Sequence, residues 1–232
     1  MARGRLVVFE GSEGAGKTTQ LRRLSARLAA LHVSHACLQE PGGTALGNEI
    51  RSVLLDPAQV IAPRAEALLF MASRAQLVER EIVPRLDAGE LVLLDRFALS
   101  TYAYQVAGRG LPEREVRVAN ALATAGLVPD LTLVLTVPAE DRRGRAARRG
   151  PSDRMERAGD AFHDRVERAF ASFLAPAWQA AHPECGPIAE IDGAGTEDEV
   201  FERVTEALGA RWPETFTALR ESYPSGSPIP RS

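Results

Sequence analysis

The chain has 232 residues and a formal net charge of −3, with 45% hydrophobic and 25% charged residues. This composition is typical of a soluble globular domain with one substantial core, and the slightly acidic balance argues against binding nucleic acid or an anionic membrane through bulk charge. No apolar run is long enough to cross a bilayer and no signal peptide is evident, so we expect a cytoplasmic protein.

Short apolar runs alternate with longer amphipathic segments along the chain. The predicted strands are Arg5–Phe9, His35–Gln39, Leu91–Asp95, Leu131–Val137 and Ile188–Asp192. The predicted helices are Thr18–Leu31, Leu46–Leu55, Pro63–Leu86, Phe97–Val106, Pro112–Thr124, Ala139–Arg148, Asp160–Ala181 and Glu197–Arg211. Because the strands do not alternate cleanly between apolar and polar residues, we expect burial on both faces. The pattern predicts an α/β fold with a five-stranded parallel sheet, helices on both faces, and ligands at the carboxyl ends of the strands.

We expect residues 1–221 to form a single domain. From residue 222 onward the sequence is rich in proline and serine and buries too little to fold, so residues 222–232 are predicted to be a disordered tail. Cys37 and Cys185 lie far apart without a metal-binding spacing, which favours two reduced thiols over a disulfide or a metal site.

The segment Gly11–Thr18 fits the phosphate-loop pattern G-x-x-x-x-G-K-[ST] between a predicted strand and a predicted helix, which indicates a P-loop NTPase fold. Its glycines let backbone N–H groups surround a phosphate, and the helix N-terminus adds its positive end. Lys17 is the only lysine in the chain and is expected to reach the terminal phosphates, while the Thr18 hydroxyl is expected to bind Mg²⁺. The predicted ATP-binding residues are Gly11, Ser12, Glu13, Gly14, Ala15, Gly16, Lys17, Thr18 and Thr19.

Glu13 is unusual inside such a loop because a triphosphate repels a carboxylate. Two interpretations remain open: Glu13 contacts the metal or a sugar hydroxyl of a second substrate, or it faces solvent. A signalling GTPase reads guanine through an Asn-Lys-x-Asp motif, which cannot exist in a chain whose single lysine belongs to the phosphate loop.

Two further segments follow predicted strands and are expected at the same edge of the sheet. Glu40–Thr44 follows the second strand, and Asp95–Phe97 ends the third. We expect Asp95 to act on Mg²⁺ or its water ligands, and Arg96 to hold a phosphate. Phe70 and Arg74 lie four residues apart on one helix face, a spacing that lets the ring stack on a base while the guanidinium grips a phosphate.

Four segments, taken in order and spacing, resemble the thymidylate kinase family: Phe9–Gln20, Glu40–Leu55, Phe70–Leu77 and Asp95–Gly110. The resemblance extends over roughly Arg5–Ile191, and the combination of EPGGT with DR-x-x-x-S-x-x-AYQ is highly specific. It implies a nucleoside monophosphate kinase with a short lid. The resemblance further implies that Phe70 stacks on thymine, and that Arg74 and Arg96 hold the monophosphate with help from Arg51. The predicted substrate-binding residues are Glu40, Pro41, Arg51, Phe70, Arg74, Arg96, Thr101, Tyr104 and Gln105.

The same resemblance places Thr101 and Gln105 at the edge of the base, and Tyr104 against the deoxyribose, where it disfavours a 2′-hydroxyl. Glu13 then lies near the sugar 3′-hydroxyl and Mg²⁺. Phe97 departs from the tyrosine or histidine more often associated with its position, so no side-chain hydrogen bond is expected there. Ordinary core packing of Tyr104 and a surface location of Arg51 remain the alternatives.

Residues 141–157 carry seven arginines, and two glycines and a proline interrupt the run. Such a run is by itself typical of a solvated helix end or a nucleic-acid patch. Because the variable positions of the phosphate loop are not basic, an arginine that stabilises the transition state must come from elsewhere, and we expect this segment to be a lid that excludes water. It resembles the lid of thymidylate kinases that carry the catalytic arginine there, and this alignment favours Arg149, followed by Arg145 and Arg154.

The predicted reaction is ATP + dTMP → ADP + dTDP, with Mg²⁺ bridging the β- and γ-phosphates. The acceptor is already an anionic phosphate oxygen, so positioning and charge neutralisation carry the catalysis. Adenine is expected near Asp192–Gly195, and the family implies a homodimer with neither nucleic-acid nor membrane partners. The predicted metal ligands are Thr18 and Asp95, and the predicted catalytic residues are Glu13, Lys17, Asp95, Arg96 and Arg149.

Three other functions remain open from the sequence. One is a monophosphate kinase with another specificity, such as dUMP or dCMP. Another is a phosphate-loop switch or assembly module whose slow hydrolysis ignores monophosphates. The third is a nucleic-acid-binding module built on the arginine-rich segment, with strongly salt-dependent binding.

Overall fold

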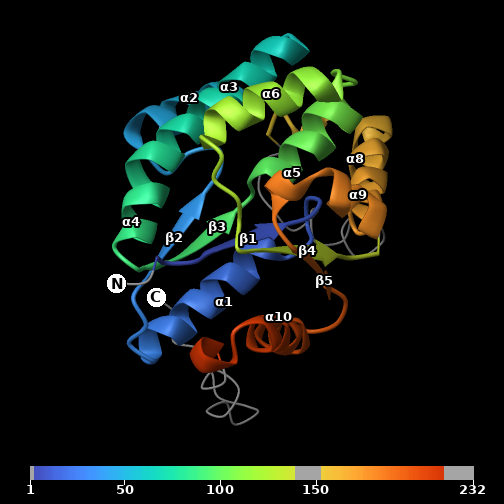
Figure 1. Cartoon of the computed structure of the whole chain (residues 1–232). Helices are drawn as coiled ribbons and strands as arrows, with labels where there is room; N and C mark the ends of the chain where they lie inside the picture. Colours follow the sequence, from blue (N-terminus) through green and yellow to red (C-terminus); the bar gives the residue numbers. More distant parts are fainter. Residues whose placement is uncertain (1–2, 139–152, 217–232) are drawn as a thin grey trace.

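The computed structural model describes residues 3–138 and 153–216 of the chain (Figure 1). Its five strands form one sheet in which every neighbouring pair is parallel, in the order β2-β3-β1-β4-β5. The predicted five-stranded parallel sheet is therefore confirmed. The strands are β1 (Leu6–Glu10), β2 (His35–Gln39), β3 (Leu91–Asp95), β4 (Leu131–Thr136) and β5 (Ile188–Asp192).

Helices cover both faces of this sheet (Figure 1). On one face lie α1 (Lys17–Ala30) and α10 (Glu197–Arg211), which pack against each other. The opposite face carries α2 (Ala45–Leu55), α3 (Pro63–Leu77), α4 (Val83–Asp87), α5 (Ala98–Thr101), α6 (Glu113–Thr124), α8 (Asp160–Phe173) and α9 (Pro176–Ala181). Two π-helical segments, η1 (Val78–Ile82) and η2 (Tyr102–Gly108), and two 3₁₀ turns, η3 (Glu156–Ala158) and η4 (Pro183–Cys185), complete the described elements.

Burial on both faces explains why the strands lack a polar alternation. Every residue of β1 is buried. Val7 and Phe9 belong to the core beneath α1 and α10, whereas Leu6 and Val8 belong to the core on the other face. Each fully buried side chain of this size contributes about 1.5–3 kcal/mol through the hydrophobic effect. The sheet is thus held by two cores, and the loops at its carboxyl edge are positioned from both sides.

The helix expected over Pro63–Leu86 is interrupted. It runs as α3, widens into the π-helical η1, and continues as α4. The backbone N–H of Val83 donates to the carbonyl of Val78, five residues back, and the next residue is Pro84. Proline has no N–H to give to the carbonyl four residues back and its ring clashes with that carbonyl, so the helix passes it with one wide turn.

The segment after β3 is also wider than an α-helix. The expected helix Phe97–Val106 is a single α-turn, α5, followed by the π-helical η2. The N–H of Arg109 donates to the carbonyl of Tyr104 at 2.9 Å, again five residues back. A Cβ on Gly108 would lie 2.6 Å from the ring of Phe162 in α8, so glycine lets α8 pack closely on this segment.

The expected helix Asp160–Ala181 is divided as well. It ends at Phe173 and resumes at Pro176 as α9, because the residue before a proline is driven out of the helical region. The predicted helix Ala139–Arg148, most of the lid and the C-terminal tail lie outside the described residues. No helix in the described ranges is long and apolar enough to cross a membrane.

Candidate active site

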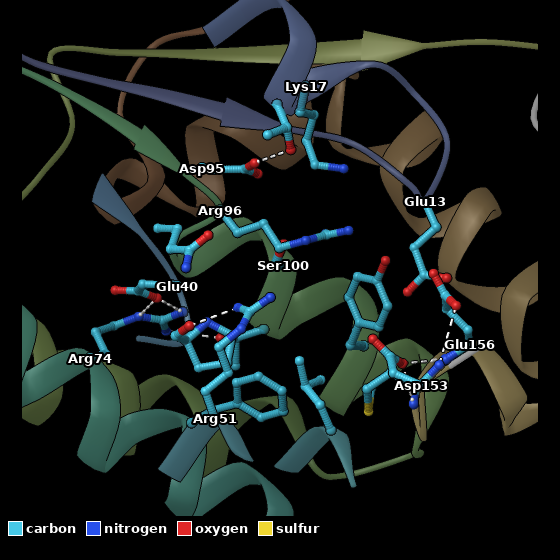
Figure 2. A pocket seen from close by; sticks show the side chains of 18 of the residues that line it. Glu13, Lys17, Glu40, Arg51, Arg74, Asp95, Arg96, Ser100, Asp153 and Glu156 are labelled. Atoms are coloured by element: carbon cyan, nitrogen blue, oxygen red, sulfur yellow. Dashed lines mark hydrogen bonds and ion pairs between the residues drawn. The ribbon is translucent and has the colours of Figure 1, made fainter. Parts of the chain in front are cut away.

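A cleft of about 270 Å³ opens at the carboxyl edge of β1, β2 and β3 (Figure 2). In Figure 2 the side chains of Lys17 and Asp95 lie on one side of it and those of Arg51 and Arg74 on the other, with Arg96 reaching into the space between. The lining residues include part of the phosphate loop and part of every predicted acceptor segment. They are Glu13, Gly16, Lys17, Thr18, Gln39, Glu40, Pro41, Arg51, Leu55, Phe70, Arg74, Asp95, Arg96, Ser100, Thr101, Tyr104, Gln105, Asp153, Met155 and Glu156.

The phosphate loop connects β1 to α1 and passes close to β4. Gly11 has φ +134°, and a Cβ there would collide with the carbonyl oxygen of Leu135. Only glycine fits this position, because an L side chain rarely adopts that backbone conformation and has no room here. Gly16 has φ +92° and precedes the first residue of α1, so the loop delivers its N–H groups at a helix N-terminus, where anions bind.

Lys17 is buried inside this loop. Its Nζ donates to the carbonyl oxygens of Gly11 at 2.9 Å and Ser12 at 2.8 Å, which holds the ammonium where a phosphate would enter. Burial, together with the charge of Arg96, lowers the pKa of Lys17 to about 7, although the nearby carboxylates of Asp95, Glu10 and Glu13 oppose the change. A bound phosphate restores the missing negative charge and thereby favours the protonated lysine.

The predicted metal ligands lie side by side. The hydroxyl of Thr18, in the first turn of α1, donates to Oδ2 of Asp95 at 2.6 Å. A hydroxyl and a carboxylate are the hard oxygen ligands that Mg²⁺ prefers when it also binds substrate phosphates. The residues therefore fit the ion. Among the described residues, however, no group of three or more histidine, cysteine, aspartate or glutamate side chains forms a metal cage.

Glu10, at the end of β1, is a residue that the sequence reasoning missed. It is fully buried, and its carboxylate accepts hydrogen bonds from the N–H of Phe97 at 2.8 Å and from the N–H and hydroxyl of Ser100 at 2.9 and 2.6 Å. Burial raises the pKa of Glu10, although the neighbouring Arg96 and these hydrogen bonds oppose the rise. Glu10 thus fixes the turn that follows β3.

Arg96 lies within that turn with φ +70°, a strained conformation for a residue other than glycine. Its Nη1 donates to the carbonyl of Gly11 at 3.2 Å and to the hydroxyl of Ser100 at 3.0 Å, and its guanidinium lies 5.1 Å from the centre of the Tyr104 ring. Burial disfavours the charge, but Tyr104 and the carboxylates of Asp95, Glu10 and Glu13 outweigh it and raise the pKa of Arg96. A permanent cation therefore faces the middle of the cleft.

Arg74, which was expected to bind the substrate phosphate, is buried and makes its hydrogen bonds within the protein. Its Nε and Nη2 lie 2.8 and 2.7 Å from Oε2 of Glu40, and Nη2 also donates to the carbonyl of Phe97 at 2.9 Å. Nη1 donates to Thr101 at 2.8 Å and to Asn120 at 2.5 Å. Because every nitrogen of Arg74 has a protein partner and its charge is paired, these contacts give no support to its holding the monophosphate.

The aromatic and polar side chains expected around a base come together at this end of the cleft. Phe70 is half-buried on α3, and Thr101, Tyr104 and Gln105 are buried on α5 and η2. The hydroxyl of Tyr104 and Oε1 of Glu40 are buried without a well-formed hydrogen bond to any described residue. These two atoms are left for a ligand to satisfy.

Arg51, Asp153 and Glu156 form the rim. The Nη1 of Arg51 donates to the carbonyl of Pro41 at 2.8 Å, and burial lowers the pKa of Arg51 while two aspartates oppose it. Asp153 and Glu156 were not predicted. Oδ1 of Asp153 accepts from the N–H groups of Met155 and Glu156 at 2.8 and 2.9 Å, immediately before and at the start of η3. The signal in the sequence that could have identified this pair is the Asp-x-x-Glu spacing, which is typical of a helix start.

Two of the three lid arginines considered for catalysis, Arg145 and Arg149, lie outside the described residues. Arg154 is described and lies on the protein body. Its Nη1 donates to Glu66 at 2.7 Å and its Nε to the carbonyl of Leu54 at 2.7 Å, so it ties the end of the arginine-rich segment to α2 and α3.

The loop expected to hold adenine adjoins the phosphate loop. The N–H of Gly193 donates to the carbonyl of Thr136 at 2.8 Å, and a Cβ on Gly193 would lie 3.3 Å from the carbonyl oxygen of Ala15. The Nη1 of Arg203 in α10 donates to the carbonyls of Asp192 and Ala194, both at 2.7 Å. The loop after β5 is therefore held beside the phosphate loop, which is compatible with the expected adenine position.

Comparison with known proteins finds a matching family and several similar chains. The family model described as thymidylate kinase matches residues 9–180. The chain is 45% identical over 211 residues to the thymidylate kinase of Deinococcus radiodurans, covering 91% of the chain and 99% of that protein. It is 45% identical over 168 residues to the one of Carboxydothermus hydrogenoformans, covering 72% and 83%. It is 38% identical over 237 residues to that of Thermosynechococcus vestitus, covering 96% and 94%.

The lowered pKa of Lys17 predicts proton uptake when ATP binds. At pH 8 most of the nucleotide-free protein carries a neutral Lys17, because its pKa is about 7. The bound phosphates favour the ammonium, so ATP binding should take up nearly one proton at pH 8 and weaken as the pH rises above 7. Isothermal titration calorimetry in buffers of different ionisation enthalpy measures this uptake. Equal uptake by the wild-type protein and Lys17→Met would contradict the prediction.

Proposed function

The chain belongs to the thymidylate kinase family, and we propose which residues of its cleft bind each of the two nucleotides of the kinase reaction. The enzyme transfers the γ-phosphate of ATP to dTMP, giving dTDP for dTTP synthesis. One cleft is lined both by Lys17 and Thr18 of the phosphate loop and by Phe70, Tyr104 and Gln105 of the predicted acceptor segments. This shared cleft supports the assignment of residues to the two nucleotides.

On the donor side, Gly11–Thr19 surrounds the phosphates of ATP, and Lys17 neutralises the charge on the β- and γ-phosphates. Thr18 and Asp95 would hold Mg²⁺, whose chemistry is to neutralise charge on those phosphates. This assignment is supported by the 2.6 Å contact between the Thr18 and Asp95 side chains. Adenine lies against the loop after β5, which adjoins the phosphate loop.

On the acceptor side, Arg96 and Arg51 bind the monophosphate of dTMP. Both line the cleft, and Arg96 donates to the phosphate loop itself, so it can bind a phosphate close to the γ-phosphate. Phe70 stacks on thymine, and Tyr104 packs against the deoxyribose, where a 2′-hydroxyl would clash. Glu40 and Pro41 form the wall beside Arg51.

Arg74 is proposed to act at the base rather than at the phosphate. Its pairing with Glu40 and its hydrogen bond to Thr101 support a role in shaping the base pocket. Glu13 lines the cleft on the side of Asp153 and Glu156 (Figure 2), which supports a contact with the sugar 3′-hydroxyl or with water bound to the metal. We propose that residues 141–157 form the lid and that Arg149 stabilises the transferring phosphoryl group.

A comparison of acceptors tests the base pocket. dTMP should be phosphorylated with a higher kcat/KM than dUMP, by about tenfold, because the thymine methyl group is worth one to a few kcal/mol in an apolar pocket. Steady-state assays with ATP and each monophosphate measure the ratio. Equal kcat/KM values for the two would refute a thymine-specific pocket, and hydrolysis of ATP unaffected by either would favour the switch interpretation.

The lid arginine has its own test. Arg149→Ala should lower kcat by on the order of a thousandfold, because an arginine that neutralises transition-state charge has at least that effect in phosphoryl transfer. Arg157→Ala is the matched control, since Arg157 lies in the same segment and is exposed. Rapid-quench measurement of dTDP formation separates the chemical step from product release. A kcat within tenfold of the wild type for Arg149→Ala would exclude this residue.

We also propose that the enzyme is a homodimer acting in the cytoplasm, where ATP and deoxynucleotides are used. The support for a dimer is apolar surface on neighbouring helices: α3 packs against both α2 and α6, and these helices lie together in Figure 1. Several of their large apolar side chains are exposed, with Leu122 at 85%, Val118 at 68% and Leu68 at 62%. Burial of such a patch is a common reason for association.

Charges placed on that surface should separate the subunits. The wild-type protein should have twice the chain mass of 25.0 kDa by light scattering, and Leu68→Arg/Leu122→Arg should have the mass of one chain, because like charges repel across a symmetric contact. Val60→Arg is the control, since Val60 is fully exposed in the loop between α2 and α3. A monomeric wild-type protein at micromolar concentration would contradict the proposal.

A further inference from the structure

Glu66 is a buried carboxylate that the phosphoryl-transfer scheme leaves without a role. It lies in the first turn of α3 with no exposed surface. Oε1 accepts from Nε of Arg109 at 3.0 Å and from Nε2 of Gln105 at 3.2 Å. Oε2 accepts from Nη2 of Arg109 at 2.9 Å and from Nη1 of Arg154 at 2.7 Å. Burial alone would raise the pKa of Glu66, but these donors outweigh it and lower the pKa below its usual value, so Glu66 is ionised.

An ionised carboxylate accepts hydrogen bonds and donates none. The side-chain amide of Gln105 has a donor end and an acceptor end, and only the donor end can face Glu66. Gln105 is buried, and it lines the cleft beside Phe70 and Tyr104. With one N–H of Nε2 held by Glu66, the carbonyl oxygen is directed away from Glu66 and is the acceptor that the amide offers to a ligand's base.

The hydroxyl group of Thr101 is also oriented by a hydrogen bond within the protein. Its hydroxyl oxygen accepts from Nη1 of Arg74 at 2.8 Å, which leaves the hydroxyl proton to donate to a ligand. The base end of the cleft therefore presents an acceptor on Gln105 and a donor on Thr101. Thymine and uracil carry an N3–H donor flanked by two carbonyl acceptors, whereas N3 of cytosine is an acceptor beside an amino group. The two side chains complement the first pattern and oppose the second.

We propose that Glu66 is a positioning residue for specificity: it holds the Gln105 amide with its carbonyl oxygen toward the base, and thereby selects pyrimidines that carry an N3–H over cytosine. The proposal rests on the proposed binding of the dTMP base beside Phe70 and Gln105. In this proposal Glu66 does not contact the substrate and takes no part in phosphoryl transfer.

The contacts of Glu66 also define a variant that should turn the Gln105 amide around. In Glu66→Gln, the new side chain has one oxygen and one NH₂ group. Two arginine nitrogens meet at the position of Oε2 but only one at the position of Oε1. The oxygen therefore remains at the position of Oε2, and the NH₂ group takes the position of Oε1, where it gives up the bond from Nε of Arg109 and faces Gln105. Gln105 then gives its own oxygen to that NH₂ group and presents its Nε2 to the base. The altered site accepts N3 of cytosine and opposes N3–H.

The test measures kcat/KM for dTMP, dUMP and dCMP with ATP. In Glu66→Gln the preference for dUMP over dCMP should fall by about tenfold, the effect of one hydrogen bond. The preference for dTMP over dUMP should stay within twofold, because both bases carry N3–H. Arg109→Met is the matched control: it removes two contacts of Glu66 but leaves the bond between Glu66 and Gln105, so the dUMP to dCMP ratio should remain that of the wild type.

A uniform loss of kcat/KM for all three monophosphates in Glu66→Gln, with unchanged ratios, would overturn the proposal, as would an equal change of ratio in Arg109→Met. Thermal denaturation establishes that each variant is folded. If Glu66→Gln does not fold, Glu66→Asp keeps the charge opposite the arginines but withdraws the carboxylate from Gln105, and an unchanged ratio in that variant overturns the proposal. A wild-type enzyme inactive on dTMP would refute the proposed function itself, which keeps the two failures distinct.

Discussion

The cleft depends on the buried carboxylate of Glu10. Three hydrogen bonds from the turn after β3 end on it, so the carboxyl ends of the central strand β1 and its neighbour β3 are held together. This contact keeps Arg96 in a strained backbone conformation and directs its guanidinium toward the phosphate loop. An unpaired buried carboxylate is costly, and here the donors that offset the cost are the same groups that build the site. The groups proposed to bind the donor and acceptor phosphates are thereby positioned before any ligand binds.

Buried charges are stabilised differently at the two ends of the cleft. At the end of the cleft where the base is proposed to bind, Arg74 is paired with Glu40, and Arg109 and Arg154 are paired with Glu66, so these charges are neutralised within the protein. At the phosphate end, Lys17 has carbonyl partners and a lowered pKa. A phosphate bound there would favour the protonated form of Lys17.

Much of this architecture could be predicted from the sequence, because its signals are local. The phosphate loop, the strands and the EPGGT and Asp-Arg segments are contiguous, and parallel strands bring their carboxyl ends to one edge. The helices were predicted less well. Pro84 and Pro176 interrupt two of them, and the wide turn η2 has no marker in the sequence, since it is fixed by packing of α8 on Gly108. The prediction that Arg74 binds phosphate uses its spacing to Phe70, and this spacing does not reveal the hydrogen bonds that its nitrogens make within the protein.

The sequence by itself determined the fold class, the phosphate-binding loop and the family, because each is encoded in short motifs whose residues act through their own backbone or their immediate neighbours. Only the tertiary structure decided which groups Glu10, Glu66 and Arg74 contact. Their hydrogen bonds join residues far apart in the chain, 90 positions between Glu10 and Ser100 and 88 between Glu66 and Arg154. A buried carboxylate takes its role from the donors that surround it, and those donors are known only once the chain has folded.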